Sequence, residues 1–206
     1  DQVKQVIAIE KDDELSGFLE KTIQKNNLKN IKIINNDILK VNPEDYQDFK
    51  IIANLPYYIS GQFLRIFLAH RHQDSFLMLQ KEVAQRIVAG PPNHSLLSLS
   101  VQFYSNPEIL FIVKANNFHP IPKVDSAFIR LTPTTYDLIN EDYFFKTIKM
   151  AFASKRQTLL NNLKRGFQLN KNEIEKILES LNINPKKRAQ ELSLDDYIKL
   201  AKILPH

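Results

Sequence analysis

The chain has 206 residues, of which 43% are hydrophobic and 25% are charged, and it contains no cysteine. This composition is typical of a folded globular chain and excludes disorder as its main state. The lack of cysteine excludes disulfides, zinc–thiolate sites, iron–sulfur clusters and a cysteine nucleophile. The sequence has neither a run of 18 apolar residues nor a basic leader before a short apolar stretch. We therefore expect no membrane association and a cytoplasmic location.

Glycine is scarce in this chain. Its four glycines are isolated from one another, at Gly17, Gly61, Gly90 and Gly166. An average usage of about 7% would give roughly 14 glycines. The 206 residues therefore contain no glycine-rich nucleotide-binding loop of the dinucleotide or Walker type. Any nucleotide cofactor is held in another way, or its loop is missing.

The net charge of +5 is confined to one end of the chain. Residues 1–150 contain 17 basic and 17 acidic side chains, whereas residues 151–206 contain 11 and 6. A basic lobe beside a neutral one is typical of a surface that contacts phosphates. A solvated helical surface without a ligand would carry the same charge, so charge alone leaves both interpretations open.

The first 80 residues alternate short β-rich runs with amphipathic helices, which indicates parallel strands joined by crossover helices. Four strands are predicted, over 5–10, 31–35, 49–55 and 75–79. A helix is predicted between the first two strands, and others around 63–68 and from residue 81 to Gly90. Residues 36–46 are polar and contain Pro43, so they are predicted to form a loop. The pattern as a whole predicts an open α/β sheet.

The pattern changes after residue 94. The predicted elements are then a helix over 96–104, a strand over 109–113, a loop over 118–123 and a strand over 126–131. Two neighbouring strands without a helix between them predict an antiparallel edge of the sheet. Beyond residue 143 only helices are predicted, over 143–153, 155–165, 171–181 and 193–204. The last is marked by a near capping box of Ser193 and Asp196. We predict two domains, residues 1–135 and 136–206.

Three predicted strands end in residues suited to ligand binding, and ligands bind at the carboxyl ends of the strands in open α/β sheets. Glu10 ends the first strand, Asp37 follows the second, and Asn54 lies at the end of the third. One carboxylate can accept hydrogen bonds from both hydroxyls of a ribose, and another can accept from an adenine amino group. Each acid by itself is better explained as a helix N-cap or a solvated loop residue than as a binding residue. Their joint placement favours a nucleotide cofactor.

The tetrapeptide Asn54-Leu55-Pro56-Tyr57 is the sharpest signal in the chain. Methylating an exocyclic amine is difficult because its nitrogen lone pair is delocalised into the ring. The side-chain oxygen of Asn54 and the carbonyl of Leu55 could accept the two amine protons and favour a pyramidal nitrogen. Pro56 stiffens the turn, and Tyr57 offers a flat face to an extruded base. The alternative is a strand that ends in a turn with a buried tyrosine.

Other kinds of site have little support in the sequence. No two of the five histidines are spaced i, i+4, and none lies beside a carboxylate at metal-ligand spacing, so we expect no metal. The serines at 95, 98 and 100 show no nucleophile-elbow pattern, which leaves no argument for a hydrolase.

Seven stretches of the chain, in order, resemble the KsgA-type ribosomal RNA adenine dimethyltransferases. They are AIEKD at 8–12, NND at 35–37, ANLPYYIS at 53–60, LQKEVAQRIVA at 79–89, FHPIPKVDSAFIRL at 118–131, AFASKRQTLLNNL at 151–163 and KRAQELSLDDYIKLA at 187–201. The resemblance implies a Rossmann-like class I methyltransferase sheet with a small all-helical C-terminal domain. It also implies transfer of methyl groups from S-adenosylmethionine to the exocyclic amines of two adjacent adenines of small-subunit rRNA during ribosome assembly.

The resemblance also implies roles for individual residues. Glu10 would bind the cofactor ribose, Asp37 and the backbone of Ile38 its adenine, and Asn54 both cofactor and target amine. The implied catalytic residues are Asn54, Leu55, Pro56, Tyr57 and Phe118, the two aromatic side chains packing on the target base. The implied contacts to rRNA phosphates are Lys155, Arg156, Lys164, Arg165, Lys186, Lys187 and Arg188. The expected partners are small-subunit rRNA and the pre-ribosomal small subunit, and we expect a monomer.

One part of the family pattern has no counterpart in these residues. The family has a basic segment, a strand, a glycine-rich GxGxGxLT-type loop and a helix before the strand that ends in Glu10, whereas this sequence starts directly before that strand. The absent strand lies centrally, so its removal is expected to leave backbone groups of its neighbours unpaired. We therefore expect a fragment, whether engineered, processed or from a truncated gene, that lacks methyltransferase activity by itself.

Three other functions remain open at this point. A large-subunit rRNA adenine methyltransferase has a similar sheet and tetrapeptide, although the C-terminal stretch 187–201 favours the small-subunit enzymes. Methylation of a glutamine amide in protein uses a related Asn-Pro-Pro-Tyr turn, but the basic helical lobe argues against it. A non-catalytic RNA-binding factor of ribosome assembly, or a transcription-factor relative, would also fit a chain without the glycine-rich loop.

Overall fold

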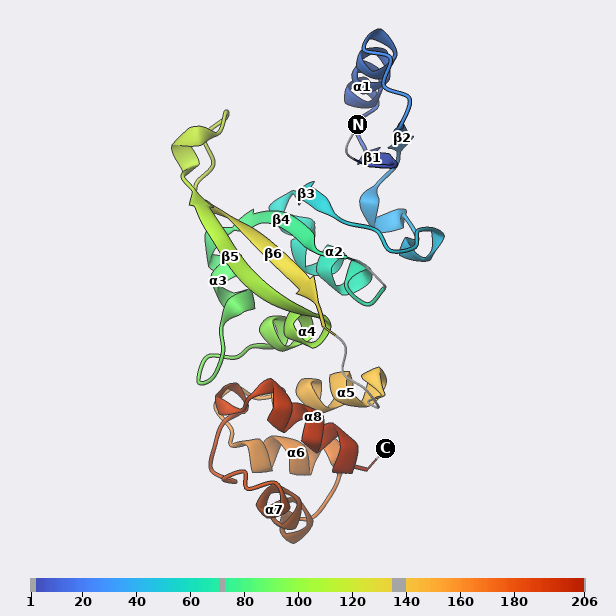
Figure 1. Cartoon of the computed structure of the whole chain (residues 1–206). Coiled ribbons are helices and arrows are strands. Elements are labelled where there is room, and N and C mark those ends of the chain that lie inside the picture. Colours follow the sequence, from blue (N-terminus) through green and yellow to red (C-terminus); the bar gives the residue numbers. More distant parts are fainter. Residues whose placement is uncertain (1–2, 71–72, 135–139, 206) are drawn as a thin grey trace. The chain divides into compact units, whose positions relative to one another are not determined.

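A computed structural model describes residues 3–70, 73–134 and 140–205 and divides the chain into two compact units, residues 1–47 and 48–206 (Figure 1). The boundary that we predicted between residues 135 and 136 lies outside the described residues. The four-stranded sheet and the C-terminal helices both belong to the second unit. None of the described helices is both long and apolar enough to cross a bilayer.

The first unit is a β–α–β unit followed by two short 3₁₀ turns. Its elements are β1 (Val6–Glu10), α1 (Asp13–Lys25), β2 (Ile31–Asn35), η1 (Ile38–Lys40) and η2 (Pro43–Asp45). The two strands are parallel, and Glu10 lies opposite Asn35. Helix α1 begins where Asp12 accepts a hydrogen bond from the Leu15 backbone N–H at 2.9 Å. The predicted strands are confirmed here, and the predicted loop 36–46 contains the two 3₁₀ turns.

The second unit contains a mixed sheet with the strand order β3-β4-β6-β5. Its strands and helices are β3 (Ile52–Asn54), α2 (Ser60–Phe67), β4 (Ser75–Gln80), α3 (Lys81–Val88), α4 (Leu96–Tyr104), β5 (Ser105–Val113) and β6 (Ser126–Pro133). Strands β3 and β4 are parallel, and β6 is antiparallel to both of its neighbours. The predicted antiparallel edge is confirmed. The predicted strand 49–55 was too long, because only 52–54 form continuous pairs with β4.

One face of this sheet carries the core of the second unit. Leu77 and Leu79 of β4 and Ile129 and Leu131 of β6 are completely buried, while the residues between them are partly exposed. This alternation places every second side chain on the face that α3 and α4 cover. The carboxyl ends of β3 and β4 are thereby held at one edge of a rigid sheet.

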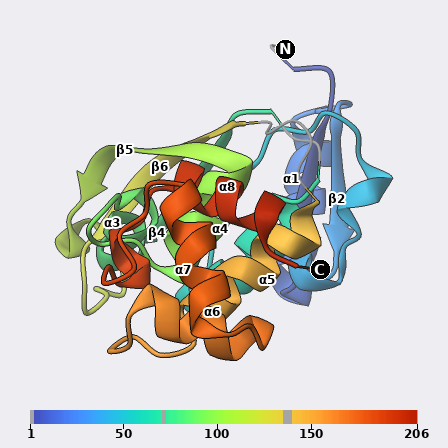
Figure 2. The same cartoon turned by 90° about the horizontal axis from the view of Figure 1, so that it is seen from below.

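The C-terminal helices pack around a second core that includes α4. They are α5 (Glu141–Ala151), α6 (Leu159–Phe167), α7 (Lys171–Ser180) and α8 (Leu194–Ile203), grouped together in Figure 2. Leu99 and Phe103 of α4 belong to their hydrophobic core, and Phe103 stacks on Phe144 with ring centroids 4.1 Å apart. Helix α4 is therefore shared between the sheet and the helical part.

The prediction of a helix over 155–165 was wrong at its start, because α6 begins at Leu159. Thr158 caps the helix, and the buried side chain of Asn162 reaches back to the preceding segment. Its amide nitrogen donates to the carbonyl oxygens of Ala151 at 2.7 Å and Ser154 at 3.0 Å. These bonds hold residues 151–158 in a turn, so Lys155 and Arg156 lie in a loop and not on a helix.

The contacts of Asn162 predict a large effect on stability. Asn162→Ala is expected to lower the free energy of unfolding by about 2–3 kcal/mol, because two carbonyl groups lose their donor. Urea unfolding measures this change. Asn161→Ala is the matched control, since Asn161 is exposed, and it is expected to change stability by less than about 0.5 kcal/mol. Equal losses in both variants would contradict the assigned role.

Candidate active site and nucleic-acid interface

The carboxyl edge of β1 and β2 brings Glu10 and Asp37 to one side of the first unit. Glu10 ends β1 opposite Asn35, and the Lys11 ammonium contacts an Asp37 carboxylate oxygen at 2.9 Å. One carboxylate oxygen of Glu10 accepts the Asp12 N–H at 2.9 Å. The other carboxylate oxygen of Glu10 accepts no hydrogen bond from the described residues. It can therefore accept one from a ribose hydroxyl. The sequence had singled out both acids but not Lys11, which follows Glu10 directly.

Asp37 has a structural role in the first unit. It caps the turn η1 by accepting the Leu39 N–H at 3.0 Å. The hydrogen bond from Lys11, followed by that from Leu39, lowers the pKa of the Asp37 carboxyl below its usual value. Asp37 is therefore an ionised acceptor at neutral pH. Ile38 is the first residue of η1, where a backbone N–H has no partner inside the turn. A carboxylate acceptor next to an N–H donor matches the edge of an adenine.

The tetrapeptide 54–57 forms the turn between β3 and α2. Asn54 is the last residue of β3 and is exposed, whereas Leu55 is buried and anchors the turn in the core. The carbonyl of Pro56 accepts the Ile59 N–H at 3.1 Å. The hydroxyl of Tyr57 lies 2.9 Å from the hydroxyl of Ser126, the first residue of β6. The alternative of a fully buried tyrosine is not observed, because the Tyr57 side chain is only half-buried.

Phe118 lies in the loop between β5 and β6, at the same edge of the sheet. Gln80 at the end of β4 and Val113 at the end of β5 both pair with Ser126. Asn54 pairs with Met78, two residues before the end of β4. The loop over 114–125 therefore leaves the sheet next to the turn that carries Asn54 and Tyr57. Phe118 is half-buried in this loop, and its N–H donates to the Ala115 carbonyl at 3.2 Å.

Asp125 closes the base of the loop that carries Phe118. Its carboxylate accepts the Ala115 N–H at 3.1 Å and contacts the Lys114 ammonium at 3.2 Å and that of Lys81 at 3.9 Å. The Ala115 N–H, then Lys114, lower the pKa of the Asp125 carboxyl below its usual value. Asp125 and Ser126 lie inside the family-like stretch 118–131, yet the sequence did not distinguish them from their neighbours. The partner of Ser126 is Tyr57, which is distant in the chain, and the partner of Asp125 is Ala115, at the other end of the loop. Neither contact is visible in the local sequence.

The helical part brings together two basic segments that are 30 residues apart in the sequence. The Leu159 N–H donates to the carbonyl of Lys187 at 2.8 Å, which joins loop 154–158 to turn 184–188. The Arg165 guanidinium donates to the Ser154 hydroxyl at 3.0 Å. We name the following exposed side chains the basic surface: Lys155, Arg156, Arg165, Lys186, Lys187 and Arg188. Lys164 is also exposed, but in the described residues no hydrogen bond joins it to either segment.

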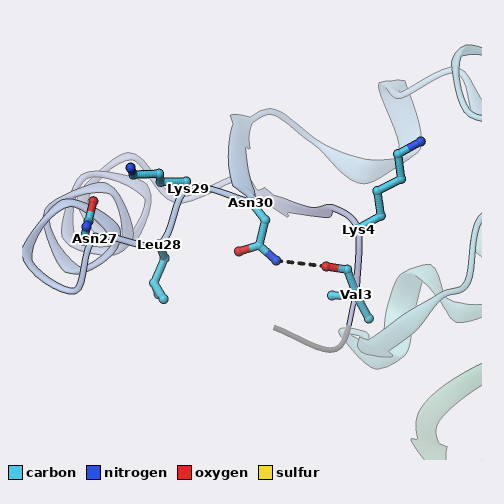
Figure 3. Close-up of a pocket in the computed structure, with 6 residues that line it drawn as sticks. All are labelled: Val3, Lys4, Asn27, Leu28, Lys29 and Asn30. Carbon is cyan, nitrogen blue, oxygen red and sulfur yellow. Dashed lines mark hydrogen bonds between the residues drawn. The ribbon is translucent and has the colours of Figure 1, made fainter.

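A shallow pocket of about 320 Å³ lies elsewhere in the first unit (Figure 3). It is lined by Val3, Lys4, Asn27, Leu28, Lys29 and Asn30. The Asn30 side chain donates to the Val3 carbonyl at 3.2 Å across it. These residues flank the amino ends of β1 and β2, opposite the edge where Glu10 lies. The pocket is therefore not part of the predicted cofactor site. Over residues 3–70, 73–134 and 140–205, no three His, Asp or Glu side chains are arranged to hold a metal ion.

The chain matches a family model and several known proteins. Residues 1–205 match the family model described as ribosomal RNA adenine dimethylase. The protein ribosomal RNA small subunit methyltransferase A of Dehalococcoides mccartyi (strain CBDB1) is 40% identical over 205 residues, which span 95% of this chain and 70% of that protein. Its namesake of Mycoplasmopsis pulmonis (strain UAB CTIP) is also 40% identical, over 97% of this chain and 79% of the relative.

Solved structures with the same fold include a dimethyladenosine transferase from Plasmodium falciparum. It superposes with a TM-score of 0.81 at 26% identity, over 96% of this chain and 80% of its own. The 23S rRNA methyltransferase ErmE superposes with a TM-score of 0.77 at 21% identity, over 98% of this chain and 82% of its own, which shows the fold alone. The expectation of a Rossmann-like methyltransferase sheet with a helical C-terminal part is confirmed. This chain belongs to the ribosomal RNA adenine dimethylase family and is, by family, an S-adenosylmethionine-dependent RNA methyltransferase.

Proposed function

We propose that the gene product that contains this chain dimethylates the exocyclic amines of two adjacent adenines in small-subunit rRNA. The observation that carries the proposal is the turn at the end of β3, where an exposed Asn54 lies three residues before the half-buried Tyr57. Tyr57 is tied through its hydroxyl to the sheet at Ser126. An acceptor and an aromatic face held by a rigid strand end suit an extruded adenine.

The chemistry requires the amine nitrogen to attack with a localised lone pair. The Asn54 side-chain oxygen and the Leu55 carbonyl would accept the two N–H groups of the amine, which favours a pyramidal nitrogen. S-adenosylmethionine, when bound, supplies an electrophilic methyl group on a sulfonium. Methyl transfer would form the new C–N bond and break the C–S bond, whose electron pair would pass to sulfur, and the amine would lose one proton to solvent. Tyr57 and Phe118 would hold the base flat during this step.

The first unit would hold the nucleoside part of the cofactor. Glu10 would accept hydrogen bonds from the ribose hydroxyls through the oxygen that is not bonded to Asp12. Asp37 would accept from the adenine amino group and the Ile38 N–H would donate to a ring nitrogen. The ionised state of Asp37 and its position in a capped turn support this assignment.

The basic surface would bind the phosphates of the rRNA. Its two segments are joined at their backbones by the Leu159–Lys187 hydrogen bond, so the positive charges are grouped before RNA arrives. Grouped Lys and Arg side chains favour a phosphate backbone by releasing its counterions. We further propose the assembling small subunit, and not free rRNA alone, as the physiological partner.

The test is methyl transfer from radiolabelled S-adenosylmethionine in the gene product that contains residues 1–206. Small subunits and naked small-subunit rRNA that lack the modification are the substrates, and digestion to nucleosides detects dimethyladenosine. We expect two adjacent dimethyladenosines, formed faster on subunits than on naked rRNA.

Two matched substrates distinguish the alternatives. Label in large-subunit rRNA alone would favour the large-subunit methyltransferases, and label in a glutamine-bearing peptide would favour protein methylation. Tight binding of small-subunit rRNA without methyl transfer would indicate the non-catalytic RNA-binding factor. Each of these three results would overturn the proposal.

A further inference from the structure

Two adjacent residues at the start of β6, Asp125 and Ser126, contact both segments that carry the aromatic side chains of the site. Ser126 binds Tyr57, which is 69 residues earlier in the chain. Asp125 binds Ala115, which in turn accepts the N–H of Phe118. The proposed function uses Tyr57 and Phe118 but leaves this pair of polar residues without a role.

Ser126 is buried and has a paired strand on each side. It is 1% exposed, and β6 lies between β4 and β5, so Ser126 pairs with Gln80 on one side and Val113 on the other. Its hydroxyl lies 2.9 Å from that of Tyr57. A half-buried tyrosine ring that is bonded through its hydroxyl to a fixed strand loses most of its freedom to swing.

Asp125 fixes the other aromatic segment. Its carboxylate bonds to the Ala115 N–H and the Lys114 ammonium at the start of the loop, and its carbonyl accepts the Lys81 N–H at 3.0 Å. The loop is thus closed at its base and attached to the beginning of α3. Phe118 sits three residues after Ala115 in this closed loop, so its position depends on the Asp125 contacts.

We propose that Asp125 and Ser126 are positioning residues that fix Phe118 and Tyr57 relative to each other, so that the two rings receive the target adenine in one orientation. The inference rests on the proposed function, since it assumes that both rings touch the base. Because the pair makes one rigid junction between two distant segments, loosening either contact misplaces one ring without removing it. A misplacement of about 1 Å can reduce a rate on the order of 10²-fold.

The experiment uses Ser126→Ala, Tyr57→Phe and the double variant in the gene product that contains this chain. Each single variant is expected to lower kcat for methyl transfer about 10-fold or more, with KM for RNA changed by less than about twofold. The double variant is expected to lose no more than either single variant, because all three remove the same contact. Asp125→Ala is expected to lower kcat further than Asp125→Asn, which keeps an acceptor for the Ala115 N–H.

A second readout does not depend on methyl transfer. RNA with 2-aminopurine in place of the target adenine fluoresces strongly when the base leaves the helix and is quenched when it stacks on an aromatic ring. The wild-type protein is expected to quench the extruded base, and Ser126→Ala and Asp125→Ala are expected to bind RNA equally well with less quenching. If Ser126 and Asp125 served only the stability of the fold, their variants would show a lower melting temperature and weaker RNA binding. They would not show reduced quenching at unchanged RNA affinity.

Glu108→Gln is the matched control. Glu108 pairs with Arg130 at 2.9 Å across the same two strands but away from the loop, so its loss is expected to leave kcat and quenching unchanged. Normal kcat and quenching in the Ser126 and Asp125 variants, with an active wild type, would overturn this inference alone. A wild type without methyl transfer to rRNA would overturn the proposed function and this inference together.

Discussion

Asn54→Ala in the gene product that contains this chain is expected to lower kcat for rRNA methylation by on the order of 10²–10³-fold, the usual cost of removing one oriented polar group from a reacting centre. The side-chain oxygen of Asn54 is the acceptor that would draw the amine into a pyramidal geometry. It lies at the exposed end of β3, so its removal leaves the core intact. Affinity for rRNA is expected to change little, because the proposed phosphate contacts lie on the basic surface and not at Asn54. Single-turnover methyl transfer and filter binding measure the two quantities.

Two variants control the Asn54 experiment. Asn54→Asp keeps an acceptor oxygen in the same position and is expected to retain more activity than Asn54→Ala. Asn106→Ala makes the same truncation at an exposed position near the start of β5, away from the edge where Asn54 lies, and is expected to be fully active. Equal loss of methylation and RNA binding in Asn54→Ala would point to a folding role, which melting temperatures of the three variants would reveal.

Lys155→Ala/Arg156→Ala is expected to weaken rRNA binding and to reduce its salt dependence. Removing two phosphate contacts should make the slope of log K against log salt less steep by about 1.4–1.8, whatever the RNA sequence. Lys186→Ala/Lys187→Ala/Arg188→Ala should reduce it by about 2.1–2.7. The hydrogen bond between the two segments uses the backbone carbonyl of Lys187, so neither set of truncations removes it. Binding titrations between low and physiological salt measure the slopes.

The matched control for the basic surface is Lys171→Ala/Lys176→Ala. Both lysines are exposed on α7, in the same helical part but outside the two joined segments, and they carry the same charge. The control is expected to keep the wild-type slope. If both double variants changed the slope equally, binding would depend on net charge and not on the basic surface. If neither changed it, the basic side chains would be ordinary solvated residues.

Much of the first unit could be predicted from its sequence because the relevant signals are local. Alternating apolar runs marked β1 and β2, and the acids that follow them necessarily fall at the same edge when two strands are parallel. The same logic placed Asn54 at a strand end. The ion pair between Lys11 and Asp37 was not predictable, because it joins residues 26 positions apart whose side chains meet only when the two strands pair.

Loop 154–158 shows why the local sequence pattern gave a wrong helix start in the C-terminal part of the chain. Its residues have ordinary helix propensity, so the periodicity extended α6 back to residue 155. The buried amide of Asn162 instead satisfies two carbonyl groups of the preceding segment, and that gain exceeds the few tenths of a kcal/mol by which helix propensity favours the alternative. As a consequence, Lys155 and Arg156 lie in a loop before the helix, and this loop is joined to the turn that carries Lys187.

The sequence by itself determined the kind and order of the elements, the polar residues at the strand ends, the excess of positive charge after residue 150 and, through seven ordered stretches, the family. The tertiary structure alone decided that β6 enters between β4 and β5, which brings Ser126 to Tyr57, and that two basic segments share a backbone hydrogen bond. The physical reason is the distance along the chain over which each interaction acts. Periodicity and capping act over a few residues and are written in the local sequence, whereas strand order and side-chain partners depend on packing between segments far apart in the chain.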